Sequence, residues 1–521
     1  MVSASTLLVI SALGIYIHAI FLSISLGFPW IILALLYKWW RTHEEEYFHA
    51  IRTATGVLGL NFALGAITGT LVEFGLVQAW PGTIFVIATF AFLPLTFELV
   101  AFASEIVLLV LFVVTLQKVK PLVSIGIMAA YLVMAAFSGA VIMTVNSWLN
   151  VPWGTQSLAS NIYPFLPSYG PAAVDPIALL KLKIALVGQL LTGGTPASLI
   201  QNPKVASTIG LTLHDPMIAF GSPYALVSIL HAVNAGMIFG ISVGLVGYSF
   251  RFFKTHKVTY LKLIRAILPV LLVLMILQPI VLGDSMGKMV AAYQPTKFAL
   301  MENINKTRTD PLIAFLGYGN PQRQVIGFDT FTNACQQLND RTLGDLSRSV
   351  IGNATSGPES SLSLRQLCMS DVATSRAQIG IVSGAFLTKI ASGIIALAAL
   401  IALVSLTFDL GIISRTSRKI TSRFGRERSI FLLSLIFLGT VMMAAGLGWF
   451  VREVGRKPWT VYGLVYPEEL ITPVPVDPVV LALFTLAFVS VAIIGLYGMY
   501  FVATRPLKFT ELLEKGAGAE K

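Results

Sequence analysis

The chain is poor in charged residues and in cysteine. Only 12% of its 521 residues are charged, about half the share of roughly 25% that is usual in soluble proteins. With 55% hydrophobic residues and a mean hydropathy of +0.79, this scarcity excludes a soluble globular enzyme and a disordered protein. Two cysteines are too few for a cluster with four cysteine ligands or for a disulfide-rich scaffold. Most of the chain is therefore expected to lie in lipid.

The chain contains long apolar runs. A membrane helix needs about 20 predominantly apolar residues. Nine segments meet this requirement: 6–37, 53–78, 84–116, 121–146, 220–250, 263–284, 379–410, 429–451 and 477–502. A tenth apolar stretch, Ile177–Gly193, contains Lys181 and Lys183 and is expected to be an interfacial helix. The predicted fold is an all-α polytopic protein of the cell membrane, with residues 1–521 forming a single membrane domain.

Basic residues predict how the nine helices are oriented. With the N-terminus outside, the inner segments are 38–52, 117–120, 251–265, 414–428 and 503–521, and they hold 20 of the 36 Lys and Arg residues. Because cytoplasmic loops are enriched in Lys and Arg, we expect the N-terminus outside and the C-terminus in the cytoplasm. The net charge of +11 then reflects topology, and no nucleic-acid partner is expected.

One outer loop, residues 285–378 between the sixth and seventh predicted helices, is polar. Loops longer than about 15 residues are usually functional or disordered. Both cysteines, Cys335 and Cys368, lie in it, on the side of the membrane that is oxidising in most cells. They are expected either to form a disulfide or to remain as two thiols.

Two histidines, His18 and His231, lie inside apolar helices. A single histidine there is either a hydrogen-bonded packing residue or a ligand. Imidazole is a standard axial ligand of haem iron, and a haem between helices needs the large apolar walls that this chain offers. Haem binding is therefore one of the two hypotheses for these residues.

Carboxylates inside the spans are rarer and more informative, because a charge within the bilayer costs at least a few kcal/mol. Glu98 and Glu105 are seven residues apart in the third span, which puts them on one helix face about 10 Å apart along the axis. Two stacked acids favour a proton relay, and the alternative is a buried acid paired with a polar neighbour. Glu73, near the outer end of the second span, and the intramembrane cation Lys389 also need partners.

The outer end of the eighth span carries the run Gly448-Trp449-Phe450-Val451-Arg452-Glu453-Val454-Gly455-Arg456-Lys457-Pro458-Trp459. A membrane-surface anchor would use tryptophans and basic residues. It would not explain the carboxylate of Glu453 in the middle of the run. We therefore expect a polar ligand to bind here.

This run resembles subunit I of the cytochrome bd quinol oxidases, whose hallmark is Gly-Trp…Glu-x-Gly-Arg-x-Pro-Trp. Other segments earlier in the chain also resemble family motifs, and they occur in the same order as in the family. They are Tyr16-Ile17-His18 with Leu26-Gly27, Asn61–Gly65 with Thr68-Gly69 and Glu73-Phe74, Asn146-Ser147-Trp148 with Pro152, and Gly283-Asp284 with Gln294, Lys297 and Glu302. The resemblance runs from the first helix to the outer end of the eighth, and it implies nine helices with the N-terminus outside.

The resemblance implies roles for the unusual residues. His18 and Glu453 correspond to axial ligands of two high-spin haems, a haem b and a haem d (or a b-type haem in its place), with the assignment of each ligand left open. His231 corresponds to a ligand of a low-spin haem b. The other correspondences are Glu98 and Glu105 to the cytoplasmic proton pathway, Lys297 and Glu302 to quinol oxidation, and Trp449, Arg456, Lys389 and Glu73 to the haem pocket.

One departure from the family pattern concerns the low-spin haem. The family carries Arg-Ile-Met in the seventh helix, and its Met is the second axial ligand. Here the run is Lys389-Ile390-Ala391, and Ala391 has no side chain able to bind iron. That haem would be five-coordinate, bound by another ligand, or absent.

The resulting hypothesis is a haem-containing subunit of a terminal oxidase that oxidises quinol at the outer face. It would reduce O2 to water with cytoplasmic protons, and generate a membrane potential without pumping. Family members pair with a second membrane subunit, and some carry small single-helix subunits. Two alternatives stay open. One is a paralogous subunit with an incomplete haem set that supports an active copy, and the other is a secondary transporter, for which intramembrane Glu and Lys are also normal.

Overall fold

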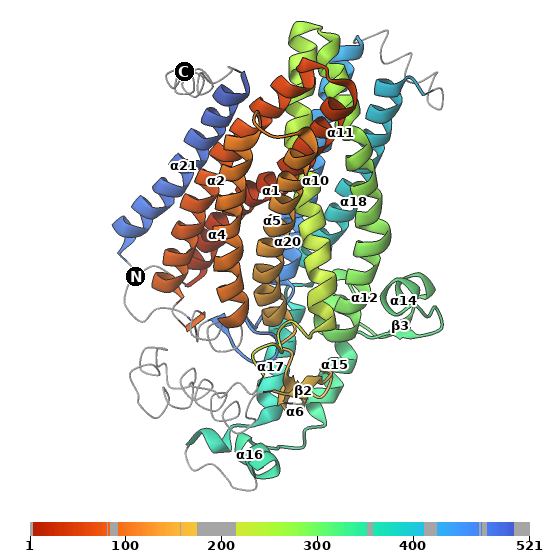
Figure 1. The fold of residues 1–521 in the computed structure, drawn as a ribbon. Helices are drawn as coiled ribbons and strands as arrows, with labels where there is room; N and C mark the ends of the chain where they lie inside the picture. The colour runs from red at the N-terminus through yellow and green to blue at the C-terminus, as the bar shows by residue number, and fades with distance from the viewer. Residues whose placement is uncertain are drawn as a thin grey trace.

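A computed structural model describes residues 4–80, 82–83, 92–156, 158–173, 215–351, 358–410, 425–467, 470 and 477–504. Within these ranges, nine helices are long and apolar enough to cross a membrane, as the sequence predicts. They form one elongated bundle (Figure 1). The predicted interfacial helix 177–193 and the first residues of the predicted third span lie outside the described residues.

The membrane helices extend past the apolar runs that define them. Their bounds are α1 Ala4–Thr42, α2 Glu45–Ala79, α4 Phe92–Thr115, α5 Pro121–Asn150, α10 Pro223–Thr255, α11 Val258–Leu277, α18 Ile379–Phe408, α20 Arg426–Val454 and α21 Pro478–Thr504. The α11 span continues through a π-helix, η1 Gln278–Gly283, into α12 Asp284–Tyr293. The loop therefore begins after Tyr293, nine residues later than predicted, because the pair Lys288–Asp284 at 2.6 Å neutralises its charge within the helix.

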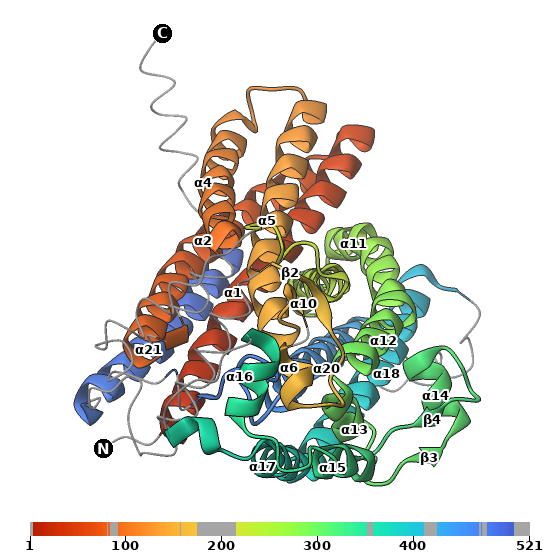
Figure 2. The same cartoon turned by 90° about the horizontal axis from the view of Figure 1, so that it is seen from below.

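Polar segments gather at one end of the bundle, which we call the loop end (Figures 1 and 2). They are β1 Thr155–Gln156, α6 Leu158–Ile162, β2 Tyr169–Ala172, α13 Pro295–Met301, β3 Arg308–Thr309, α14 Pro311–Tyr318, β4 Gln324–Val325, α15 Phe328–Gln336, α16 Leu343–Ile351, η2 Pro358–Ser361 and α17 Leu364–Arg376. The short strands pair antiparallel, β1 with β2 and β3 with β4. A disulfide joins Cys335 of α15 to Cys368 of α17. The loop is thus a folded layer with its own buried side chains.

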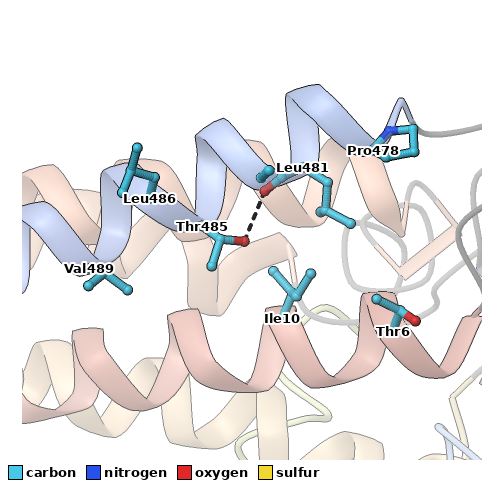
Figure 3. Close-up of a pocket in the computed structure, with 8 residues that line it drawn as sticks. Thr6, Ile10, Pro478, Leu481, Thr485, Leu486 and Val489 are labelled. Atoms are coloured by element: carbon cyan, nitrogen blue, oxygen red, sulfur yellow. Dashed lines mark hydrogen bonds between the residues drawn. The ribbon is translucent and has the colours of Figure 1, made fainter.

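The helix α21 lies at the edge of the bundle beside α1 and α2 (Figure 1). Near the loop end, an apolar groove runs between α1 and α21, lined by Thr6, Ile10, Leu481, Leu486 and Val489 among others (Figure 3). The Thr485 hydroxyl donates to the carbonyl of Leu481 at 2.9 Å, within its own helix. The groove therefore presents almost no unsatisfied polar group to the lipid.

The centre of the bundle depends on two glycines. A Cβ on Gly27 of α1 would lie 2.4 Å from the backbone of Gly240 in α10, and a Cβ on Gly240 would lie 2.1 Å from the carbonyl oxygen of Ser23. The two helices are therefore in direct backbone contact, which is the way small residues join helices in a membrane. This contact fixes α1, which carries His18, against α10, which carries His231.

Gly240→Ala should destabilise the protein, because the added methyl group would have to push the two backbones apart. Overpacking of this kind costs about 1–3 kcal/mol, so the thermal midpoint in detergent should fall. Gly247→Ala is the matched control, since no atom lies within 4 Å of a Cβ at Gly247 on the same helix. Equal midpoints for the two variants would contradict the backbone contact.

Candidate functional site

Glu453 lies in a cluster of buried polar side chains where α20 ends at the loop end. Its Oε1 accepts a hydrogen bond from Asn146 Nδ2 of α5 at 3.1 Å, and its Oε2 accepts one from Arg456. The Glu453 side chain is 30% exposed, whereas that of Arg456 is 7% exposed. A carboxylate offers about four lone-pair sites, so Glu453 keeps the capacity to bind a further partner.

Arg452 ties three membrane helices together beneath Glu453. Its Nε donates to Asn146 Oδ1, Nη1 donates to Ser228 Oγ of α10 at 2.6 Å, and Nη2 donates to Ser147 Oγ of α5 at 3.3 Å. The residue is buried. Because an unpaired charge in the interior is strongly destabilising, these contacts hold the end of α20 against α5 and α10.

Lys297 enters the same cluster from the loop layer. Its Nζ donates to Asn150 Oδ1 at 3.2 Å, Gln294 Oε1 at 3.3 Å and the Arg452 carbonyl at 3.1 Å. Burial, with the positive charges of Arg452 and Arg456, holds the pKa of Lys297 well below its usual value. Three basic side chains thus surround the single acid Glu453, and the buried Arg456 Nη1 has no partner among the described residues. The cluster suits an additional anionic group.

Glu302 takes no part in this cluster, although the sequence predicts that it acts together with Lys297. It caps the end of α13, and its charged neighbours among the described residues are Asp310 and Arg308. Burial, reinforced by Asp310, raises the pKa of the Glu302 carboxyl. A carboxyl of this kind exchanges its proton closer to neutral pH than an ordinary glutamate does.

His18 is held by α2 in a defined tautomer. Its Nδ1 lies 3.0 Å from Thr68 Oγ1, and that hydroxyl donates to the carbonyl of Leu64 at 2.9 Å. With its proton directed to a carbonyl of its own helix, the hydroxyl would accept from Nδ1, and we therefore assign the free lone pair to Nε2. A Cβ on Gly69 would lie 3.0 Å from the ring, so glycine gives the imidazole its space. A hydrogen bond at one ring nitrogen is the usual support of a metal-binding histidine.

Glu73, Glu98 and Glu105 are the acids that α2 and α4 carry within the predicted spans. Glu98 interacts electrostatically with Glu73 and with Glu105. Glu105 is 5% exposed and is hydrogen-bonded to Ser138 of α5. Glu98 is half-buried, and Glu73 is exposed at the surface of α2. The structure therefore combines the two hypotheses from the sequence, since the stacked acids lie together and one of them has a polar partner.

His231 has a neighbour that sequence reasoning missed. Gln278, the first residue of the π-helix, donates from Nε2 to the His231 carbonyl at 3.1 Å, and this nitrogen lies 3.3 and 3.4 Å from the two ring nitrogens. Its Oε1 accepts from Asn234 Nδ2 at 2.7 Å. Ala391 is exposed on α18 and offers no donor atom. These residues do not fit a haem with two axial protein ligands, because His231 alone has the required chemistry.

Lys389 and Trp449 lie on the facing helices α18 and α20. A Cβ on Gly448 would lie 3.4 Å from Lys389 Cε, so the lysine stem passes over this glycine, and its Nζ lies 5.9 Å from the ring centre of Phe386. Lys389 also interacts electrostatically with His231. Trp449 is half-buried four residues before Glu453.

Aromatic side chains join the run Gly448–Trp459 at the end of α20 to the loop layer. Trp459 Nε1 donates to Tyr163 Oη at 3.3 Å. Tyr163 and Tyr466 donate to the same oxygen of Asp371 on α17, at 2.5 and 2.6 Å. Tyr462 and Thr296, next to Lys297, share a hydrogen bond of 2.5 Å. These contacts cover the Glu453 cluster on the side away from the membrane helices.

Sequence reasoning missed the side chains that support these residues. Asn146 and Asn150 are four residues apart at the end of an apolar helix, a spacing that places two amides on one face and that could have indicated a shared polar partner. Gln278 follows 20 residues of α11 without a comparable signal. Its contact with His231 depends on the packing of α10 against α11.

Comparison with known proteins agrees with this picture. The family model "Cytochrome bd terminal oxidase subunit I" matches residues 9–506. A curated protein of Bacillus subtilis (strain 168), "Putative cytochrome bd menaquinol oxidase subunit I", is 22% identical over 313 residues. That alignment spans 59% of this chain and 60% of the relative, so it covers less than two thirds of the relative's length.

A solved structure shares the fold. The structure of bd oxidase from Geobacillus thermodenitrificans superimposes with a TM-score of 0.68 at 17% sequence identity, over 97% of this chain and 99% of the other. This likeness concerns the fold. The family model, which covers nearly the whole sequence, shows that the chain belongs to the cytochrome bd terminal oxidase subunit I family.

Proposed function

We propose that this chain is the haem-containing subunit of a cytochrome bd-type terminal oxidase in the cell membrane. It would oxidise membrane quinol near the outer face and reduce O2 to water with cytoplasmic protons. The observation that carries the proposal is the state of His18, whose Nδ1 is engaged by Thr68 while Nε2 keeps its lone pair. A packing histidine has no need of a free lone pair in an apolar bundle.

His18 and Glu453 would hold the high-spin haems, one b-type and one d-type or a b-type in its place. When bound, haem supplies the redox chemistry, and the protein supplies ligands, orientation and a dry environment. Arg456 and Arg452 carry more positive charge than Glu453 balances, so this end of the cluster would bind the carboxylate groups of a haem. This requirement explains why charged side chains stay buried at the loop end.

Quinol oxidation would take place on the loop-end side of the cluster, which the distribution of basic residues places outside. Oxidation of two quinols releases four electrons and four protons. Glu302, whose pKa is raised by burial, is suited to take up such a proton and to pass it to the outer solvent. Lys297 would act differently, because its three acceptors fix it within the cluster. It would hold α13 in place and orient the quinol site.

The four protons consumed when O2 becomes two waters would come from the cytoplasm through Glu105 and then Glu98. Drawing protons from one side and releasing them on the other separates charge without a pump. Each elementary charge moved fully across is worth about 2.3 kcal/mol per 100 mV. The electrostatic interaction between Glu98 and Glu105 is consistent with successive positions in one relay.

A second membrane subunit would complete the enzyme, and small single-helix subunits would be further partners. The helices α4 and α21 expose large apolar side chains along most of their length. Faces of this kind are covered by lipid or by another membrane helix.

A second candidate function is favoured by one observation. Ala391 removes a ligand of the low-spin haem, and Gln278 occupies the neighbourhood of His231. The chain would then be a paralogous subunit with an incomplete haem set that supports an active partner.

The reduced-minus-oxidised spectrum of the purified complex tests the proposal directly. We expect b-type and d-type haem signals and quinol-dependent oxygen consumption, with the extracted haems identified. A b-type signal without a d-type signal and without oxygen consumption would favour the paralogous subunit. A complete lack of haem would reject both functions and leave the secondary transporter.

Thr68→Val should lower haem content, because His18 would lose the acceptor that fixes its tautomer. Loss of such a supporting hydrogen bond typically weakens binding about 10–100-fold, which haem extraction against protein concentration measures. Thr70→Val is the control, since the exposed Thr70 hydroxyl only donates to the Ala66 carbonyl of its own helix. Equal haem content in both variants would argue against His18 as a ligand.

Ala391→Met tests the low-spin site. If a haem binds at His231, methionine should supply the missing ligand and convert the spectrum to a six-coordinate low-spin form, with a changed reduction potential. Ala391→Leu adds similar volume without a sulfur atom and should leave the spectrum unchanged. An unchanged spectrum in both variants would show that the His231 site is empty or that its haem already has another ligand.

A further inference from the structure

The proton pathway that the proposed function requires is incomplete on α4. Inward of Glu105, the helix runs through Ile106–Val114, in which every residue is apolar. At 1.5 Å per residue, this leaves a stretch of about 14 Å in which α4 offers no group that could carry a proton. Leu109 and Phe112, which follow Glu105 on its buried face, are closed to water. Another helix must supply the route.

The helix α5 packs along α4 and supplies polar groups at the required positions. Ser138, which is hydrogen-bonded to Glu105, is preceded by Tyr131 and Ser124 at intervals of seven residues. Seven residues return to nearly the same helix face, about 10 Å further along the axis. Since α5 begins at the end of the bundle opposite the loop end, this row leads from that end to Glu105.

Tyr131 is the unusual member of this row. Its side chain is 0% exposed, and its hydroxyl has no close hydrogen-bond partner among the described residues. It interacts electrostatically with Glu105 and makes a loose polar contact with the Ser25 hydroxyl of α1, which is not a hydrogen bond of ordinary geometry. A buried polar group without a partner costs about 1–3 kcal/mol. A phenol at this site therefore has a use other than packing, which phenylalanine would serve better.

Asn61 and Ser124 also have a buried polar atom without a hydrogen-bond partner among the described residues. Asn61 of α2 donates from Nδ2 to Ser25 Oγ and to the Phe21 carbonyl, both at 2.9 Å, while its buried Oδ1 has no partner among the described residues. The buried Ser124 hydroxyl is also without one there. Buried polar groups in this situation are commonly satisfied by internal water, which needs two to four polar partners. At Tyr131, the hydroxyls of Ser25 and Tyr131 with the Asn61 amide meet this need.

We propose that protons reach Glu105 from the cytoplasm along a hydrated row of side chains on α5, formed by Ser124, Tyr131 and Ser138, with Ser25 and Asn61 completing its wall at Tyr131. Each hydroxyl passes a proton by accepting one on its oxygen and donating its own, so no group gains net charge. The proposal rests on the proposed function, because it concerns the protons consumed in oxygen reduction.

The test uses the purified complex, reduced anaerobically and then mixed with O2 in weakly buffered solution containing a pH dye. Tyr131→Phe should slow proton uptake and steady-state oxygen consumption at least about tenfold, in the range expected when a proton-transfer group is removed. Haem content and haem reduction by dithionite should stay at the wild-type level. Tyr248→Phe is the control, because it removes a half-buried phenol from α10, outside this row.

Tyr131→Ser separates proton transfer from packing. Serine keeps a hydroxyl and leaves room for water, so it should recover part of the rate lost in Tyr131→Phe. A packing role predicts the opposite order, since phenylalanine preserves the volume of tyrosine and serine leaves a cavity. Wild-type proton uptake in Tyr131→Phe, or slower uptake in the serine variant, would overturn the proposal.

Glu105→Gln distinguishes this failure from failure of the proposed function. If Glu105→Gln is slow while Tyr131→Phe is normal, the proton relay stands and only the α5 route is rejected. If the wild-type complex consumes no oxygen, the proposed function fails and this inference fails with it.

Discussion

The buried guanidinium of Arg452 is the interaction on which the loop end of the molecule depends. It reaches α5 through Asn146 and Ser147 and α10 through Ser228. The Arg452 carbonyl accepts the hydrogen bond of Lys297 from the loop layer. A single residue therefore joins three membrane helices to α13. Because a buried charge is tolerated only when it is paired, the helices cannot separate here without a large cost. Glu453 owes its position to this restraint.

The lipid environment imposes the second constraint, because it offers polar groups no water as a hydrogen-bond partner. In the bilayer every polar group has to find a partner inside the protein. The contacts of Glu453 and His18 both follow from this rule. Asn146 donates to Glu453, and Thr68 lies 3.0 Å from His18 Nδ1, in positions that water could fill in a soluble protein. The same rule makes the unpartnered Tyr131 hydroxyl informative. In a soluble protein a tyrosine hydroxyl without a protein partner would be less informative.

Much of the fold could be predicted from the sequence, because the length of an apolar run is a local property. The nine spans and their order followed from it. The end of α12 did not, because Asp284 and Lys288 look like the start of a loop until their pairing within the helix is seen. Glu453 and His18 were found through the motif and the depth of the residues. Their partners were not, because Asn146 lies 307 positions from Glu453 and Thr68 lies 50 from His18. Such contacts depend on helix packing, which one sequence does not reveal.

The disulfide between Cys335 and Cys368 bears on how the protein matures. It connects α15 to α17, three residues before Asp371 receives its two tyrosine hydroxyls. Those tyrosines flank the run that ends at Trp459, which is synthesised after the loop has been exported. With the loop end outside, as proposed, the covering layer would be completed after insertion of the eighth helix, and an extracytoplasmic oxidant would form the disulfide. Biogenesis of the site would then involve two separate steps, membrane insertion and thiol oxidation.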